Sequence, residues 1–153
     1  VFNDFLATNK VDKVILSASW KDEDIPGLIE TLDTLRSRGL DVTVLGPIVE
    51  YDGALPRLLA DGILRNKPVA QGMRTSGIRE RDRAMREVVI SKGASYLSVY
   101  DSVCGGGRCD EFAAGDVPLQ FDAGHLTAEG SVEVARRLSS SFRRAGGIKN
   151  ASN

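Results

Sequence analysis

The feature that most constrains the fold of this chain is the regular alternation of short apolar runs with amphipathic segments. The runs "DKVILSAS", "DVTVLGP" and "ASYLSVYD" are rich in Val, Ile, Leu or Tyr and are bounded by charged or turn-forming residues. Such runs are typical of buried parallel strands, which we expect at residues 13–19, 41–46 and 95–100. Apolar residues at helical spacing predict the intervening helices, at about residues 22–39, 54–65, 76–92 and 128–144. This order of elements predicts an α/β fold with a parallel sheet.

Length and charge narrow the class of protein. A chain of 153 residues is long enough for one domain with its own core, so we expect a single domain over residues 1–153. The formal net charge is only −1, which gives no indication of a nucleic-acid or membrane-surface partner. No apolar run approaches the ~18 residues that a membrane span requires. We expect neither a cofactor nor a catalytic metal.

The stretch "PLQFDAGHLTAEGS" holds His125, the single histidine of the chain, with Asp122 three residues before it. A neutral imidazole can take a proton from a hydroxyl when a carboxylate bonded to its other ring nitrogen fixes its tautomer and tilt. The pair follows the strand-like segment "VPLQF" and precedes a helix, a position where open α/β sheets place ligands. A catalytic pair is one interpretation, but on this spacing alone a surface histidine beside a chance acidic residue is favoured.

Two cysteines, Cys104 and Cys109, bracket a Gly-rich loop in "CGGGRC". This pattern favours a disulfide in an oxidising compartment. The alternatives are two free thiols or a zinc site completed by carboxylates. A phosphate-binding loop is disfavoured because the G-x-G-x-x-G pattern is absent and no helix is expected directly after the loop.

Four stretches, taken in order, resemble blocks of a known family. "DAGHLTAEGS" is similar to the last block of the SGNH (GDSL-type) hydrolases, and "VDKVILSASW" resembles the third block of the SGNH domain fused to membrane acyltransferases of the acyltransferase-3 type. "VTVLGPIVEYDGALPRLL" and "YDSVCGGGRC" resemble the segments that lie between these blocks. The resemblance implies a three-layer, flavodoxin-like parallel sheet. It also implies a Ser-His-Asp triad in which His125 is the general base and Asp122 orients it.

The sequence departs from the family pattern in two respects. No Gly-Asp-Ser occurs, so we expect this chain to be the C-terminal part of the domain, with the first strands and the nucleophilic serine on another segment. The third block lacks its usual Asn, which leaves Ser17, Ser19 or a backbone N–H near Trp20 as candidate oxyanion donors. Neither these serines nor Ser102 has the sharp glycine-flanked turn of a nucleophile. Trp20 is either a wall of the substrate site or a core aromatic.

The function that the resemblance implies is O-acetyl transfer to, or removal from, a cell-envelope polysaccharide. The alternatives are a stand-alone carbohydrate or lipid esterase and a catalytically inactive glycan-binding module. The implied partners are an acyl donor, a glycan acceptor, the segment that carries the serine and a membrane acyltransferase domain. The implied location is periplasmic or extracytoplasmic, as a soluble domain of an inner-membrane protein.

Overall fold

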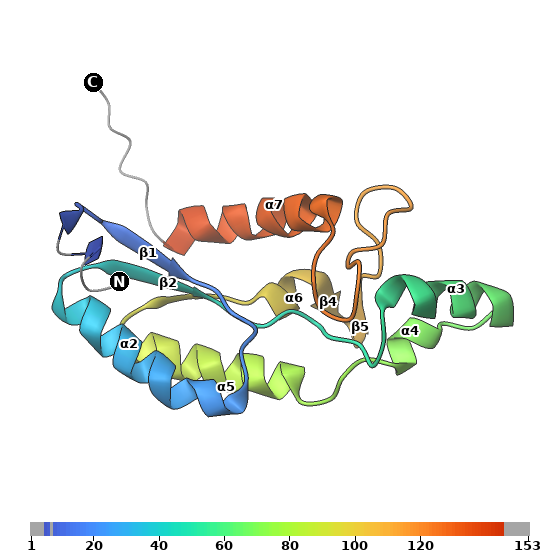
Figure 1. Ribbon diagram of the computed structural model, residues 1–153, viewed down its shortest axis with the longest axis horizontal. Helices are drawn as coiled ribbons and strands as arrows, with labels where there is room; N and C mark the ends of the chain where they lie inside the picture. The colour runs from blue at the N-terminus through green and yellow to red at the C-terminus, as the bar shows by residue number, and fades with distance from the viewer. Residues whose placement is uncertain (1–4, 7, 146–153) are drawn as a thin grey trace, which may run out of the picture.

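Three parallel strands form the sheet of the computed structural model, which describes residues 5–6 and 8–145 (Figure 1). The strands are β1 (Lys13–Leu16), β2 (Asp41–Leu45) and β3 (Ser95–Leu97), in the spatial order β1-β2-β3. Val14 of β1 is in register with Val42, and Val44 of β2 is in register with Tyr96. The predicted α/β class with a parallel sheet is confirmed.

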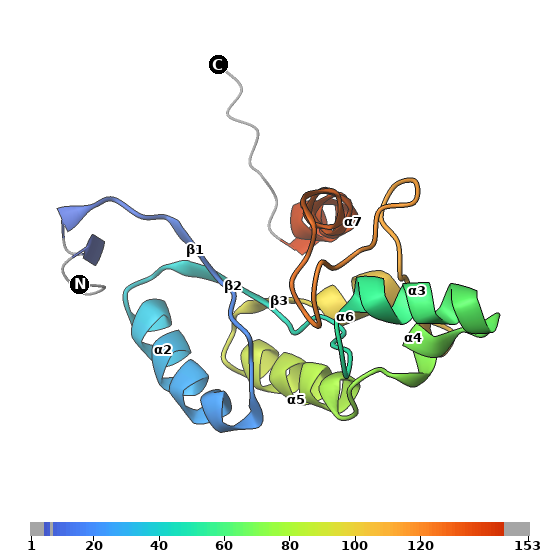
Figure 2. The same ribbon diagram turned by 45° about the vertical axis from the view of Figure 1, so that its right-hand side comes forward.

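Helices cover both faces of this sheet, which gives three layers. The helices α2 (Ile25–Ser37) and α5 (Ile78–Ser91) lie on one face, and α7 (Ala128–Ala145) lies on the other (Figures 1 and 2). Residues spaced three or four apart form the buried stripe of α2, while β2 contributes side chains that are buried in the centre of the sheet. The main core joins these elements: Leu28, Leu32, Leu35, Leu40, Val42, Val44, Met85, Val89 and Ala94.

One buried residue of α5 is a carboxylate. Asp82 is 1% exposed and accepts hydrogen bonds from the Tyr96 hydroxyl at 2.8 Å and the Ser98 hydroxyl at 2.9 Å. Arg86 lies 3.5 Å from the same carboxylate. Burial raises the pKa of Asp82 above its ordinary value, and the bonds from Tyr96 and Ser98 oppose that rise. This cluster ties α5 to β3 and packs against Gly46 at the end of β2.

The rest of the chain packs around a second core beyond the carboxyl ends of the strands. It includes α3 (Leu55–Arg65), α4 (Val69–Gly72), α6 (Val99–Val103) and the hairpin of β4 (Cys104–Gly105) and β5 (Arg108–Cys109). A 3-10 turn, η1 (Asp22–Asp24), precedes α2. The core residues come from segments far apart in the sequence: Val49, Tyr51, Leu55, Ala70, Val99, Val103, Cys109, Leu119 and Val134. This cluster supports the loops that carry the predicted catalytic pair.

Several element boundaries differ from the sequence-based expectation. β1 ends at Leu16 rather than at residue 19, because its pairing with β2 ends at the Leu16–Val44 register. Residues 99–103 form α6 instead of extending β3, since the Ser98 hydroxyl accepts the Asp101 N–H at 2.8 Å and caps the helix. Residues 69–72, expected as loop, form α4, and the strand-like residues 117–121 make only single bridges.

The outer edge of β1 has no partner strand among the described residues. Ile15 at this edge is 52% exposed, although the strands of a parallel sheet are ordinarily covered on both faces. No helix in the described part of the chain has the length and apolar character needed to cross a membrane.

Candidate active site

The predicted pair forms within a single loop turn that leads into α7. Nδ1 of His125 lies 2.7 Å from Oδ2 of Asp122. A carboxylate can only accept, so Nδ1 carries the hydrogen, and an imidazole in its neutral form then presents the lone pair of Nε2 on the opposite side of the ring. No hydrogen bond to Nε2 is formed among the described residues. The His125 side chain is 76% exposed, so Nε2 is accessible to a hydroxyl group.

The loop backbone holds the Asp122 carboxylate in place. Its Oδ1 accepts the backbone N–H groups of Gly124 at 2.9 Å and His125 at 2.7 Å. These two bonds, followed by the bond to the imidazole, lower the pKa of Asp122 to about 2. The carboxylate is therefore ionised over the whole physiological range, as an orienting group for a histidine base must be.

Neighbouring contacts fix the position of this turn. Phe121 stacks on the imidazole of His125 with ring centroids 5.8 Å apart, and its backbone N–H donates to the His125 carbonyl at 3.0 Å. Thr127 is the N-cap of α7, as expected, because its hydroxyl accepts the Gly130 N–H at 3.0 Å. The same hydroxyl donates to the Pro118 carbonyl at 2.9 Å. The start of α7 is thus joined to the chain that leads into the Asp122–His125 turn.

A cavity of about 230 Å³ lies beside His125. It is formed where the loops after β1 and β2 meet the histidine turn, and its lining residues are Ala18, Ser19, Trp20, Pro47, Ile48, Glu50, Gly124 and His125. The structure therefore brings His125 together with Ser19 and Trp20 at the carboxyl ends of the strands, where open α/β sheets bind ligands.

Trp20 lines this cavity and also packs against the main core. The indole N–H donates to the Leu45 carbonyl at 2.7 Å, and the Trp20 carbonyl accepts a hydrogen bond from Arg81 at 3.2 Å. The loop after β1 is thereby tied to the end of β2 and to α5.

Of the serine candidates, Ser19 lies at the histidine cavity and Ser102 does not. Ser19 lines the cavity but makes no hydrogen bond to His125 within the described part of the chain. Ser102 lies in α6 and donates its hydroxyl to the Val99 carbonyl at 2.7 Å, and it is not among the residues that line the histidine cavity. Glu50 and Phe121 were not expected near the site. Phe121 precedes Asp122 in the sequence and Glu50 follows β2, and these positions are the signals that could have identified them.

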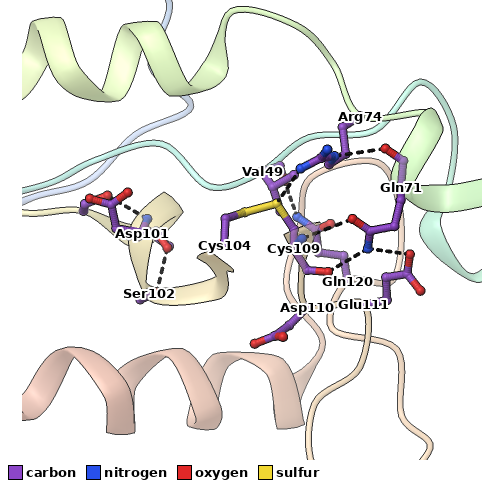
Figure 3. Close-up of a disulfide and its surroundings, with 12 residues drawn as sticks. Val49, Gln71, Arg74, Asp101, Ser102, Cys104, Cys109, Asp110, Glu111 and Gln120 are labelled. Carbon is purple, nitrogen blue, oxygen red and sulfur yellow. Dashed lines mark hydrogen bonds between the residues drawn. A yellow bond between two sulfur atoms is a disulfide. The ribbon is translucent and has the colours of Figure 1, made fainter. Parts of the chain in front are cut away.

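The predicted disulfide is confirmed. Cys104 and Cys109 are bonded across the β4–β5 hairpin, with paired Cα atoms (Figure 3). The cysteines are therefore not thiolate ligands, and no group of three or more potential metal-binding side chains occurs in residues 5–6 and 8–145. Gln71 fastens the hairpin to α4, because its side chain donates to the Cys109 carbonyl at 2.7 Å and accepts the Cys109 N–H at 3.1 Å.

The three-layer arrangement with a parallel sheet is the fold of SGNH hydrolase-like domains. The family model described as "SGNH domain (fused to AT3 domains)" matches residues 1–140, and the chain belongs to this family. The predicted resemblance is confirmed, and membership supports acyl-ester chemistry by an esterase or an acyltransferase. No curated protein sequence matches the chain.

Two solved structures share this fold. The periplasmic domain of the lipopolysaccharide acetyltransferase of Salmonella ser. Paratyphi A is 20% identical, with a TM-score of 0.72. A Bacteroides fragilis protein described as an acylhydrolase is 10% identical, with a TM-score of 0.52. The matches cover 86% and 87% of this chain but only 56% and 62% of the other two. The chain therefore spans less than two thirds of the length of each structural neighbour.

Proposed function

We propose that this chain is the C-terminal part of an SGNH domain that transfers O-acetyl groups to, or removes them from, a cell-envelope polysaccharide. The observation that carries the proposal is the Asp122–His125 pair, whose 2.7 Å bond leaves Nε2 accessible beside a cavity. Acetyl transfer is supported by family membership and by the likeness in fold to a lipopolysaccharide acetyltransferase domain. An extracytoplasmic location is supported by the disulfide between Cys104 and Cys109.

In the proposed mechanism, His125 is the general base and a serine on another segment is the nucleophile. The serine hydroxyl transfers its proton to Nε2 as its oxygen attacks the acyl carbonyl, and the Asp122 carboxylate stabilises the imidazolium. The imidazolium then protonates the departing alkoxide, and the acyl group stays on the serine as an ester. A sugar hydroxyl or water, deprotonated by Nε2, attacks the acyl-serine and restores the free enzyme. Ser19 or a backbone N–H near Trp20 supplies the oxyanion contact, a role supported by their position in the cavity wall.

The outer edge of β1 is where we place the segment that carries the serine. This edge has no partner strand among the described residues, and Ile15 is 52% exposed there. A further parallel strand would pair with β1 and bring its carboxyl end next to the loop that carries Ser19 and Trp20. Such a strand is thus placed to deliver a hydroxyl to the His125 cavity. A membrane acyltransferase domain is the proposed source of the acyl group.

Covalent labelling of the complete domain tests where the nucleophile lies. A fluorophosphonate probe should modify one serine outside residues 1–153, and His125→Ala should slow that reaction strongly because the serine loses its base. Peptide mapping by mass spectrometry locates the modified residue. Labelling of Ser17, Ser19 or Ser102 would place the nucleophile in this chain and overturn the proposal.

A second experiment tests the substrate class. If the protein transfers acetyl groups, cells that produce the wild type should carry ester-linked acetyl groups on an envelope polysaccharide, detected by NMR of the purified glycan, and if it removes them these groups should be absent. Cells that produce His125→Ala should show the opposite acetylation state from the wild type. Equal acetylation in both strains would reject the polysaccharide as the substrate. The catalytically inactive glycan-binding alternative predicts that equality.

A further inference from the structure

A second hollow, outside the histidine cavity, is lined by three arginines. A cavity of about 440 Å³ includes Arg74 and Arg79 in its wall, within the size range of small-molecule sites. A smaller adjoining hollow of about 50 Å³ includes the same two residues and adds Arg108 of the disulfide hairpin. Tyr100 and Gly107 also line both, so the two hollows adjoin each other. Together they are called the arginine hollow.

The three guanidinium groups are available to a ligand. No carboxylate of the described residues lies within ion-pairing distance of Arg74, Arg79 or Arg108. Two acidic side chains also line the hollow. Asp101 is already ion-paired with Arg86, and Glu80 is exposed. The hollow therefore carries a net positive charge in a protein whose overall formal charge is −1.

Arg74 is held in position before any ligand arrives. Its Nε donates to the Gln71 carbonyl at 3.0 Å, and its Nη1 lies 3.4 Å from Cys109 Sγ (Figure 3). The Gln71 side chain is hydrogen-bonded to the backbone of Cys109, so the disulfide hairpin is held against α4 and the turn that follows it. A guanidinium fixed in this way loses little conformational entropy when it binds an oxyanion.

The rest of the lining suits a polar, hydroxylated ligand. Thr75, Ser76 and Gly77, in the turn before the 14-residue helix α5, form part of the wall. Gly77 provides no side-chain cap, and the first N–H groups of a helix favour negative charge. Tyr100 adds an aromatic ring with a hydroxyl group. The Thr75 hydroxyl already donates to Oδ1 of Asp52 at 3.0 Å. The hydroxyls of Ser76 and Tyr100, the aromatic ring and the guanidinium groups together match a sugar that carries an anionic group.

The arginine hollow and the histidine cavity share a chain segment. Pro47, Ile48 and Glu50 line the cavity of His125, whereas Val49 lines the arginine hollow. The backbone N–H of Thr75, in the hollow's wall, donates to the Glu50 carbonyl at 2.8 Å. An extended saccharide could therefore place one unit on each side of residues 47–50.

We propose that the site of Arg74, Arg79 and Arg108 binds the oxyanion of an acidic saccharide, a phosphate or a carboxylate. This inference rests on the proposed function, because it names the substrate class of the same protein: the glycan that reaches His125 carries an anionic unit. A guanidinium can donate two parallel hydrogen bonds to a phosphate or to a carboxylate, so the same site suits either oxyanion.

Titration calorimetry on the complete domain tests this site without any turnover. The probes are glucose 6-phosphate, glucuronate, glucose and inorganic phosphate. We expect glucose 6-phosphate or glucuronate to bind more tightly than glucose and inorganic phosphate, and the stronger of the two identifies the anionic group. Binding should weaken as salt is raised. Arg79→Ala and Arg108→Ala should each weaken it about 10-fold or more, because each removes a charge-assisted contact.

Both substituted side chains are exposed, so the fold should tolerate their loss. Arg83→Ala, at an exposed position of α5 that lines neither hollow, is the matched control and should bind as the wild type does. Equal binding by wild type, Arg79→Ala and Arg108→Ala would overturn the proposal. So would glucose binding as well as the acidic sugars, or inorganic phosphate binding as tightly as glucose 6-phosphate, which would indicate an adventitious ion only. None of these outcomes depends on His125, so failure here is distinct from failure of the proposed chemistry.

Discussion

Gly46 packs directly against Tyr96, so that a Cβ at position 46 would overlap the Tyr96 hydroxyl and lie 2.6 Å from Oδ1 of Asp82. Gly46 is the residue between the end of β2 and the segment that lines the histidine cavity. The absence of a side chain there allows the buried Asp82 cluster and the cavity wall to meet at the end of the sheet.

Gly46→Ala should therefore destabilise the domain, by about 1–3 kcal/mol, the usual cost of overpacking a core. Gly27→Ala is the matched control, because a Cβ at Gly27 meets nothing within 4 Å. In the helix α2 this control should leave stability unchanged or raise it by about 0.5–1 kcal/mol. Urea unfolding of both variants measures the difference, and equal stability of Gly46→Ala and wild type would refute the close packing.

The disulfide should contribute stability. The two cysteines are five residues apart in the sequence, and a loop this short gives about 2 kcal/mol from chain entropy. The double variant Cys104→Ser, Cys109→Ser should unfold at lower urea concentration by that amount. Reductant should shift the wild type to the same midpoint and leave the double variant unchanged. Two free thiols found by mass spectrometry without reductant in exported protein would contradict the disulfide.

The pKa of Asp122 gives a pH-dependent test. It is lowered to about 2 in the folded protein, below the ~3.9 of an unperturbed aspartate, so folding favours the ionised form. Its contribution to stability is thus fully present above about pH 4 and is lost as the pH falls towards 2. A ¹³C NMR titration of the Asp122 carboxyl should give a midpoint near pH 2.

In His125→Ala the same midpoint should rise only in part, because the backbone N–H groups of residues 124 and 125 are its first causes and remain in place. A wild-type midpoint near pH 4 would show that the turn does not hold the carboxylate. If the midpoint lies near pH 2 as expected, an acid-side loss of activity well above pH 2 comes from a group other than Asp122.

The edge of β1, which has no partner strand in the described part of the chain, predicts the behaviour of residues 1–153 by themselves. An exposed apolar edge strand favours aggregation, and Ile15 is the exposed apolar side chain on this strand. The isolated chain should therefore aggregate or melt without a cooperative transition, and should not hydrolyse simple acyl esters. Ile15→Lys should reduce its aggregation. A cooperative melt with serine-dependent turnover from the isolated chain would show that the nucleophile is within it.

Features that depend on neighbours in the sequence could be predicted. Asp122 and His125 meet because they lie three apart in one turn, and the cysteines meet because a Gly-rich loop lets the chain reverse between them. The parallel sheet followed from the alternation of apolar runs with helices. In each case the signal lies within short stretches of sequence that can be recognised one at a time.

Features that depend on tertiary contacts were missed. Asp82 lies in a strongly charged helix, and its charge predicts a solvent-exposed side chain. Its spacing from Ile78 and Met85 nevertheless places it on the buried face. The partners that make its burial tolerable, Tyr96 and Ser98, belong to a later segment. The cavity wall at residues 47–50 and the arginine hollow were missed for the same reason. Both assemble from loops whose meeting is set by the second core.

The measurement that tests the account most directly is the turnover of an acyl ester by His125→Ala in the complete protein. The account predicts a fall in kcat on the order of 10³-fold or more, because triad members act as a unit, and a somewhat smaller loss for Asp122→Asn. Glu129→Gln, an exposed position in the first turn of α7, is the control and should keep near-normal turnover. Near-normal ester turnover by a folded His125→Ala protein would contradict the account and make the Asp122–His125 pair structural.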